Sequence, residues 1–304
     1  MKKISAVTLS CLLAVSMAAC SQGGQKATGN SADAPTANLS PVSIKADLSG
    51  VTQDDGVSAL VPEAVKKDGK LTLVTEASYA PAEYFGDDGK TFQGYEIDVA
   101  QALATTMGLK LDMNNAAFDS IFPAVGTTYE ASIAAITIND ERAKQYNLIQ
   151  YFQDGNTWTV AAGNPSAFDP KNPCGATVGV QTGTAQDEYL QNLNKTQCAA
   201  KPVSIQKYDS QAQVSTVLAG KQLTAMLTDT SIATAAVQQN QGKLENIGEE
   251  FDPSGRGVLV AQKDADLAKA VQAGVQKLID SGELAKIYQA WGITKGVPEK
   301  ADIL

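Results

Sequence analysis

Strand-like and helix-like segments alternate along most of this chain, and this alternation restricts the fold more than any other sequence feature. The apolar run 71–76 is typical of a buried strand, and 96–107 is typical of a helix with one apolar side. A strand, a short helix and another strand are expected near 109–113, 120–125 and 132–136. A second set of the same kind runs from 177 to 239. Strands that alternate with helices favour parallel sheets, so we expect a protein of the α/β class.

Two further strand-like segments lie outside these sets. One covers 156–162, between the sets, and the other covers 256–261, after the second set. Helices are expected near 264–279 and 283–291, where they would pack back on the first lobe. Two crossings indicate two lobes, the first of them discontinuous. We therefore expect lobe 1 over 58–157 plus 257–304 and lobe 2 over 158–256.

The N-terminus has the order of a secretory signal. Lys2 and Lys3 precede an apolar run over 4–14, and small residues follow it up to Ala19. The run is shorter than the roughly 20 residues that a membrane-spanning helix needs. We expect 1–19 to be a cleaved signal peptide and 20–57, which begins with a stretch rich in Ser, Gly, Ala and Thr, to be a flexible linker.

Cys20 follows directly after this signal, an arrangement that resembles the lipobox of bacterial lipoproteins, in which the thiol is acylated before cleavage. The resemblance implies a palmitoylated lipid anchor on Cys20 and a location at the cell membrane, on its extracytoplasmic face. An ordinary signal peptide with a chance cysteine is the alternative.

Composition excludes several classes of function. Loss of Lys2 and Lys3 with the signal leaves 22 of the 24 basic residues against 33 acidic ones, so nucleic acid is a poor partner. The chain contains no histidine, which excludes Ser-His-Asp and Cys-His catalysis and most zinc chemistry. Cys174 and Cys198 remain after the signal and Cys20 are set aside, and we expect a disulfide between them, with a free reactive pair as the alternative.

Several motifs in a fixed order carry a resemblance to a known family. They include Gly94-Tyr-Glu-Ile-Asp-Val-Ala100 and Thr137-Ile-Asn-Asp-Glu-Arg142, together with the segments 71–81, 118–123, 179–184, 227–229 and 287–292. This pattern resembles the polar amino acid-binding proteins of ABC importers, solute-binding family 3. The resemblance implies two α/β lobes joined by two hinge strands, the periplasmic-binding-protein fold of type II, with the ligand trapped between the lobes.

The resemblance also implies a function. We expect a monomeric, non-enzymatic receptor without cofactor, metal or catalytic residues, which captures a free amino acid and hands it to the permease subunits. A cyclohexadienyl-dehydratase-like enzyme, with Glu76 as general acid, is one alternative. A ligand-sensing module that works with a separate partner is another.

Matching positions predict how such a ligand would be held. For its carboxylate the resemblance implies the Arg142 guanidinium, the Thr137 hydroxyl and backbone N–H groups at Ala135 and Ala185. Thr184, the residue before Ala185, is also expected to bind the ligand. For its ammonium it implies Asp229. A solvated surface residue is the alternative for Arg142, and a helix N-cap is the alternative for Asp229.

Other matching positions predict the walls around the ligand side chain. Tyr79 and Phe118 are expected to be aromatic walls, although isolated aromatic residues are more often part of a core. Ala82 stands where the family commonly has Phe, which changes the local pocket. The 94–99 segment is expected to stabilise the first lobe and to stay outside the site.

Glu76 matches a position that meets the ligand ammonium or its side chain, and Gln181 and Thr228 match positions that sense the side chain. If Glu76 faces the cleft rather than water, it is left unpaired, which favours a polar, amide or cationic side chain over an acidic one. Arg256, near the second crossing, could reach in and neutralise Glu76.

Overall fold

The computed structural model describes residues 45–304, which form one compact unit. The predicted signal peptide, Cys20 and most of the predicted linker lie outside the described residues. Within 45–304, no helix combines the length and the apolar character that crossing a bilayer would require.

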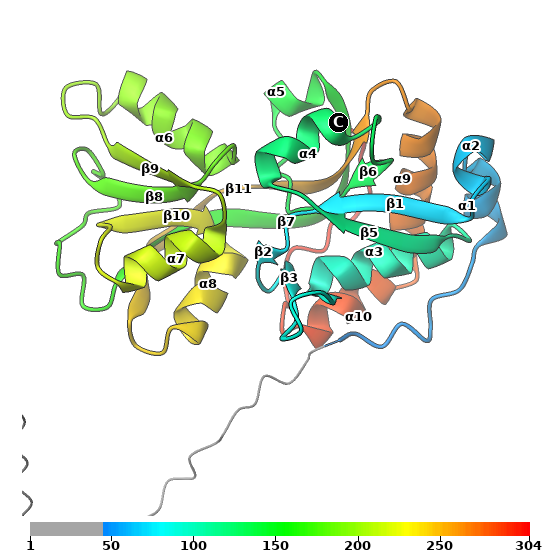
Figure 1. Cartoon of the computed structure of the whole chain (residues 1–304), viewed down its shortest axis with the longest axis horizontal. Helices are drawn as coiled ribbons and strands as arrows, with labels where there is room; N and C mark the ends of the chain where they lie inside the picture. The colour runs from blue at the N-terminus through cyan, green and yellow to red at the C-terminus, as the bar shows by residue number, and fades with distance from the viewer. Residues whose placement is uncertain (1–44) are drawn as a thin grey trace, which may run out of the picture. The chain divides into compact units, whose positions relative to one another are not determined.

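The main sheet has eight strands in the order β5-β1-β6-β11-β7-β10-β8-β9 (Figure 1). Their bounds are β1 (Lys70–Thr75), β5 (Lys110–Asn115), β6 (Ala131–Ser132), β7 (Tyr146–Ala161), β8 (Thr177–Gln181), β9 (Ser204–Tyr208), β10 (Ala225–Asp229) and β11 (Leu244–Ala261). Strands β5, β1 and β6 are parallel, as are β10, β8 and β9, whereas β7 and β11 are antiparallel to each other. The predicted α/β class with parallel strands is confirmed.

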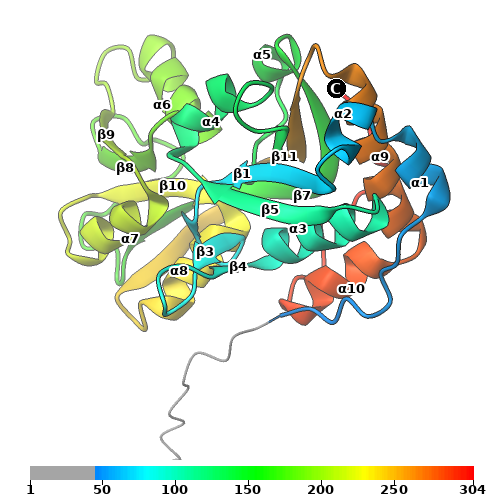
Figure 2. The ribbon, with the colours of Figure 1, turned by 45° about the vertical axis from the view of Figure 1, so that its right-hand side comes forward.

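One lobe is built on β1, β5 and β6. Its helices are α1 (Asp55–Leu60), α2 (Glu63–Lys66), α3 (Tyr95–Thr106), α4 (Phe118–Ala124), α5 (Asp140–Ala143), α9 (Ala265–Asp280) and α10 (Glu283–Ala290). Helices α3, α9 and α10 contact one another below the sheet (Figure 2), so the last two helices pack back on the first lobe as predicted. Helix α3 is buried on several sides, since Val99, Ala100 and Leu103 are all fully covered.

The other lobe is built on β8, β9 and β10. Its helices are α6 (Ala185–Lys195), α7 (Gln211–Ala219) and α8 (Thr230–Gln239). Its core gathers Trp158, Val178, Val180 and Leu190. Cys174 and Cys198 form the predicted disulfide at one end of this core, with their Cα atoms 5.1 Å apart. The free reactive pair is therefore not the arrangement that this structure has.

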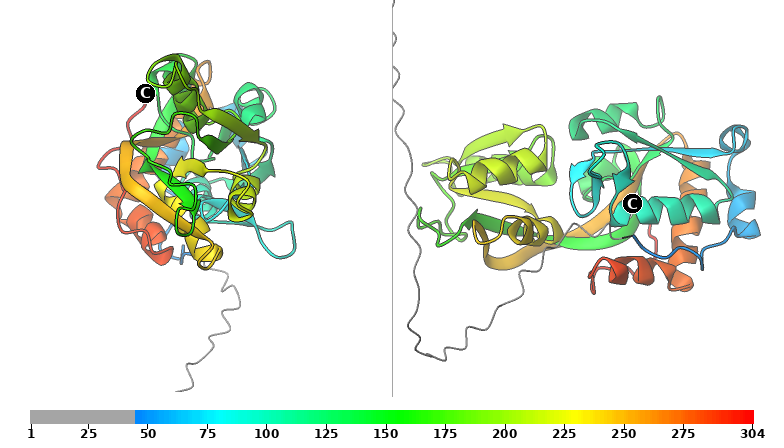
Figure 3. Two further views of the ribbon diagram at one scale, coloured as in Figure 1. Left: turned by 90° about the vertical axis from the view of Figure 1, so that its left-hand side faces the viewer. Right: turned by 60° about the horizontal axis from the view of Figure 1, so that its bottom comes forward.

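The long strands β7 and β11 run side by side through both lobes (Figure 3). Their lobe 2 ends pair near Trp158, and their lobe 1 ends pair near Val258. Between these ends the register shifts three times, over the stretch of β11 from Ile247 to Gly257. The passage from lobe to lobe therefore lies between the two positions that mark the predicted crossings, and two crossing strands are confirmed.

Two features were not predicted. A small antiparallel sheet of β2 (Ser78–Tyr79), β3 (Glu83–Phe85) and β4 (Phe92–Gln93) lies between β1 and α3. The linker expected over 20–57 is also too long, because Ala46 and Val57 are buried in the lobe 1 core. The Ala46 N–H donates to the Asp98 carboxylate at 2.9 Å, so the chain is held from this residue onward.

Candidate functional site

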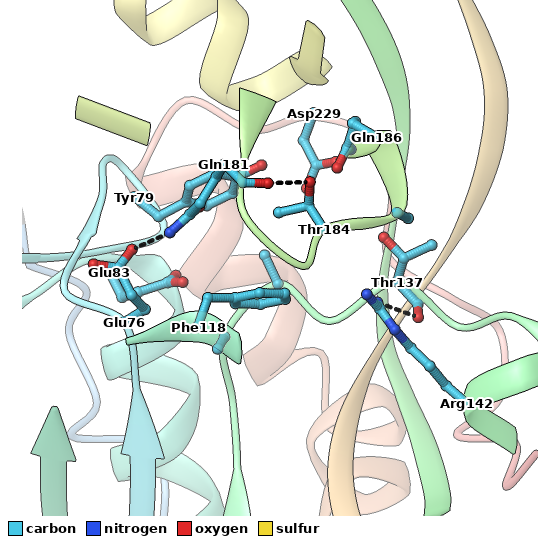
Figure 4. Close-up of a pocket in the computed structure, with 13 residues that line it drawn as sticks. Glu76, Tyr79, Glu83, Phe118, Thr137, Arg142, Gln181, Thr184, Gln186 and Asp229 are labelled. Atoms are coloured by element: carbon cyan, nitrogen blue, oxygen red, sulfur yellow. Dashed lines mark hydrogen bonds between the residues drawn. The ribbon is translucent and has the colours of Figure 1, made fainter. Parts of the chain in front are cut away.

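A small pocket lies between the two lobes. It is lined by Glu76, Tyr79, Glu83, Phe118, Ala134, Ala135, Thr137, Arg142, Gln181, Thr184, Ala185, Gln186 and Asp229 (Figure 4). The ten residues predicted to hold a ligand are all among them. Figure 4 shows Arg142 and Thr137 at one end, Glu76 and Glu83 at the other, and Phe118 between them.

Arg142 is positioned by the short helix α5. The Asn139 side chain caps this helix by accepting the Arg142 N–H at 2.9 Å. The guanidinium donates to the carbonyls of Thr137 at 3.0 Å and Gly183 at 3.2 Å, and it lies 5.0 Å from the ring centroid of Phe122. The side chain is buried, which lowers its pKa, although an arginine remains cationic at neutral pH. The alternative of a solvated surface arginine is wrong.

The backbone N–H groups of Ala135 and Ala185 were both expected to face a ligand carboxylate, but their surroundings differ. The Ala135 N–H donates to the Glu96 carboxylate at 2.9 Å, so this structure already uses it, and its role toward a ligand stays a prediction. Ala185 is the first residue of α6, where an N–H has no partner within the helix. Thr184 caps α6, since its hydroxyl accepts the Asp187 N–H and donates to the Gln181 carbonyl.

Asp229 does not stand free at the end of β10. Its two oxygens accept from Arg256 at 2.7 and 3.1 Å, and Gln186 donates to one of them at 2.7 Å. Arg256 is fully buried, and the charge of Asp229 helps to raise its pKa against the opposing effect of burial. Arg256 therefore pairs with Asp229, and the expectation that it neutralises Glu76 is wrong. Both arginines of the chain thus lie at or directly behind the pocket.

Asp229 holds the N-cap position of α8, but its side chain does not cap the helix. Asp154 of β7 supplies a carboxylate instead, which accepts the Ser231 N–H at 3.1 Å. Burial raises the pKa of Asp154 to about 6. Both oxygens of Asp229 therefore face the pocket and Arg256 rather than the helix.

Glu76 faces the pocket, so the alternative in which it points to water is wrong. It is 8% exposed and accepts from the Ser78 hydroxyl at 2.8 Å and from Gln181 of the other lobe at 2.9 Å. Burial raises the pKa of Glu76. In the part of the chain that the structure describes, no lysine or arginine forms a salt bridge with it.

Tyr79 and Phe118 form walls of the pocket. Phe118 packs edge-on against Phe122, with ring centroids 5.5 Å apart. The Tyr79 hydroxyl shares a hydrogen bond of 2.9 Å with the Thr228 hydroxyl of the other lobe. Thr228 is therefore used by Tyr79 and does not line the pocket. Ala82 lies outside the pocket as well, where its carbonyl accepts the Glu96 N–H.

Three lining residues escaped prediction, namely Glu83, Gln186 and Ala134. Glu83 had a signal in the sequence, because it is a lone acid inside the apolar stretch of Ala82, Tyr84 and Phe85. An acid in such a stretch is seldom fully buried without a partner. Glu83 is 1% exposed, and its Oε2 atom has no hydrogen-bond donor among residues 45–304.

Glu96 lies next to Glu83 and behind the pocket. Its oxygens accept the Tyr151 hydroxyl and the Ala135 N–H. Burial raises the pKa of Glu96 to about 7, and burial together with the charge of Glu96 raises the pKa of Glu83 well above its usual range. The prediction that the 94–99 segment only stabilises lobe 1 holds for Asp98, which accepts from Ala46 and Trp291, but not for Glu96.

Side chains of both charges line the pocket. Residues 45–304 contain no cluster of three or more histidine, cysteine or acidic side chains suited to a metal ion. The pocket offers the Arg142 guanidinium at one end and the acids Glu76 and Glu83 at the opposite end. The Asp229 carboxylate also lines it and pairs with an arginine behind the pocket.

Comparisons with known proteins agree with this geometry. The sequence profile of the bacterial extracellular solute-binding proteins, family 3, matches residues 71–294. The arginine-binding protein ArgT of Corynebacterium glutamicum is 29% identical over 249 residues, 81% of each chain. The L-cystine-binding protein TcyJ of Escherichia coli K12 is 29% identical over 231 residues, 75% of this chain and 84% of TcyJ.

Among solved structures, an ancestral arginine-binding protein bound to arginine superposes with a TM-score of 0.68 and 29% identity. The match covers 73% of this chain and 98% of that protein. The resemblance that the motifs carry and the two-lobed fold are thereby confirmed.

Proposed function

Because the chain belongs to the bacterial extracellular solute-binding proteins of family 3, we propose that it captures an amino acid with a cationic side chain for an ABC importer. The observation that carries this proposal is the separation of charge along the pocket. Arg142 lies at one end and the acids Glu76 and Glu83 lie at the other, with lining residues from both lobes between them.

The end at Arg142 fits a carboxylate. A buried guanidinium whose charge has no salt-bridge partner among residues 45–304 needs an anion to offset its desolvation. A ligand carboxylate supplies that anion through paired hydrogen bonds. The Ala185 N–H at the start of α6 adds a donor from the other lobe, since helix N-termini favour negative charge.

The ligand ammonium fits beside Asp229. Each oxygen of a carboxylate has two lone pairs, so Asp229 can accept from an ammonium in addition to Arg256 and Gln186. Since Arg256 already offsets the charge of Asp229, this contact contributes hydrogen bonding more than net charge. The ammonium therefore identifies an amino acid without choosing among side chains.

The choice of side chain falls to Glu76. This carboxylate is buried and without a salt bridge in the described part of the chain, so its negative charge is not offset. A cationic side chain would offset it, whereas an acidic side chain would add a like charge in a buried place. The name of the relative ArgT, an arginine-binding protein, supports an amino acid of this kind.

Ligand capture on this proposal closes the two lobes around the ligand. Tyr79, Glu76 and Arg142 of lobe 1 already contact Thr228, Gln181 and Gly183 of lobe 2. A ligand that bridges the same two walls adds contacts which exist only when the lobes are closed, so it biases the equilibrium toward closure. We infer that the closed form is then presented to the permease by a monomer held to the membrane through lipid on Cys20.

A thermal-shift screen of the twenty amino acids tests the proposal. A ligand at a hundred times its Kd stabilises the folded protein by about 2.7 kcal/mol, roughly 5–10 °C for a protein of this size. Arginine should give the largest shift and aspartate none. Agmatine, which has the guanidinium but no carboxylate, should give little shift. No shift with any amino acid would refute the proposal.

The membrane anchor needs a separate test. Cells that express the full chain are fed a labelled palmitate analogue, and the purified chain should carry the label. The Cys20→Ala variant should lose the label and remain unanchored. Label retained on that variant would refute lipid attachment at Cys20.

A further inference from the structure

The acids Glu83 and Glu96 form a buried pair at the pocket wall that the proposed contacts of the ligand backbone do not use. Glu83 lines the pocket from β3, and Glu96 lies behind it at the start of α3. Both are almost fully buried, at 1% and 0% exposure. No salt bridge among residues 45–304 reaches either of them.

The donors around the pair are unequally distributed. Glu96 accepts the Tyr151 hydroxyl and the Ala135 N–H, so its ionised form is well solvated by the protein. Glu83 accepts from no donor within residues 45–304, and its Oε2 atom is buried. A buried carboxylate without a donor is costly, whereas a protonated carboxyl that donates to a neighbouring carboxylate is satisfied. The geometry therefore assigns the proton to Glu83 and the charge to Glu96.

We propose that Glu83 and Glu96 share one proton beside the pocket, and that the cationic side chain of a bound ligand displaces this proton into solvent. This inference rests on the proposed function, because it requires a cationic amino acid in the pocket. When Glu83 loses its proton, the Glu83–Glu96 pair at the far end of the pocket carries two negative charges instead of one. The proton leaves the Glu83 carboxyl, and the ligand cation takes its place as the partner of that carboxylate.

The groups around the pair support this assignment. They are Glu76, Asp229 and the tyrosines Tyr95, Tyr151 and Tyr288, with Arg256 behind Asp229. The two acids disfavour a second charge on the pair, and Arg256 is committed to Asp229. Burial raises the pKa of each of the three tyrosines well above its usual range, so they act as neutral groups.

The unliganded pair should therefore hold a single proton, on Glu83, once the pH rises above neutral. Burial, opposed in part by the donors from Tyr151 and Ala135, gives Glu96 a pKa of about 7. Two carboxyl groups that lie close together titrate as a unit. The pair therefore holds one proton over a wide range of pH. A cation within about 4–6 Å lowers the pKa of a carboxyl, which releases that proton.

Calorimetric titration of the intact protein with L-arginine tests the proposal. The titration is repeated at pH 7 in phosphate and in Tris, whose ionisation enthalpies differ, so that the dependence of the observed enthalpy on the buffer gives the number of protons released. We expect release of up to one proton with arginine and none with L-glutamine, which has a neutral side chain. Arginine affinity should rise by up to tenfold per pH unit above pH 7, where the pair holds a single proton.

Two variants locate the proton. Glu83→Gln should abolish proton release, weaken arginine at least tenfold and make its affinity independent of pH, while glutamine affinity changes little. Glu130→Gln is the matched control, because Glu130 is also a partly buried acid of raised pKa but lies outside this pocket. The control should behave as the natural protein does.

The outcomes separate this inference from the proposed function. Arginine binding without proton release would overturn the inference and leave the proposed function intact. Binding of neutral or acidic amino acids alone would overturn both the inference and the proposed cationic ligand. Release that persists in Glu83→Gln would move the proton to another group, such as Glu76, and would also overturn it. Failure of every amino acid to bind would overturn the proposed function itself. If Glu83→Gln does not fold, the buffer dependence of the natural protein still decides.

Discussion

Replacing Glu96 with glutamine should stabilise the ligand-free protein at pH 8 by about 3 kcal/mol. The magnitude follows from the pKa of Glu96, which burial raises from its usual value of 4.5 to about 7. Each unit of difference between the folded and unfolded states corresponds to about 1.4 kcal/mol. Glutamine resembles the protonated acid, since its oxygen can accept the Ala135 N–H while its amide donates to the Tyr151 hydroxyl oxygen.

The sign of the effect depends on pH. Between pH 4.5 and 7 the folded protein retains a proton that the unfolded chain has lost, so the stability of the natural protein falls as pH rises through this range. Glutamine does not titrate, so this loss is absent from the variant. The difference between the two proteins should be smaller than about 1 kcal/mol at pH 5 and should reach its full value above pH 7.

Urea unfolding of the ligand-free proteins at pH 5 and pH 8 measures this difference. Glu63→Gln is the control, because the Glu63 side chain is 90% exposed, and it should change neither value. A Glu96→Gln protein that is less stable than the natural one by the same amount at both pH values would refute the reasoning. The hydrogen bonds of Glu96, and not its charge, would then decide stability.

Three further predictions concern charge and the disulfide. Arg142→Ala should weaken an amino acid ligand by about 3 kcal/mol, more than a hundredfold by calorimetry, because it leaves the ligand carboxylate unpaired; retained affinity would show that the carboxylate binds elsewhere. Arg256→Met should lower the free energy of unfolding by about 3–5 kcal/mol, since Asp229 is left buried and unpaired, and Asp229→Asn on the same chain should restore part of it; no restoration would contradict this account. Replacing Cys174 and Cys198 by serine should cost about 3 kcal/mol in urea unfolding and leave ligand affinity unchanged, so weaker binding would tie lobe 2 stability to the site.

The order of the elements was predictable because periodicity is local. The strand expected over 71–76 is β1, and the helix expected over 96–107 is α3, each within one residue of its predicted start and end. The sheet of β2, β3 and β4 escaped prediction because its strands have only two or three residues, too few to show a period. The early packing of Ala46 and Val57 escaped for a similar reason, since single apolar residues in a polar stretch carry no pattern.

Site residues that belong to a sequence motif were predictable. Their hydrogen-bond partners from distant parts of the chain were not. Motif positions brought Arg142, Gln181 and Asp229 to one pocket. The partner of Asp229 is Arg256, 27 residues later on β11, and nothing local in the sequence reveals that pairing. The use of the Ala135 N–H by Glu96 spans 39 residues and is equally hidden from local patterns.

The lobe bounds 58–157 plus 257–304 and 158–256 stay a prediction. The pairing of β7 with β11 locates the passage between lobes near Asp154 and Ser254, where the register shifts. Where the pairing of two strands shifts, fewer regular hydrogen bonds join them, so bending of the strands breaks fewest of these bonds there. Hydrogen exchange in the presence and absence of ligand would give the bounds directly.

One calorimetric comparison tests the central claim most directly. L-arginine and L-citrulline have nearly the same shape, but only arginine carries a charged side chain. If the acids at the far end of the pocket recognise a cation, arginine should bind at least tenfold more tightly at pH 7.5, as expected for a hydrogen bond between charged groups. Equal affinity for the two, or tighter binding of citrulline, would contradict the account.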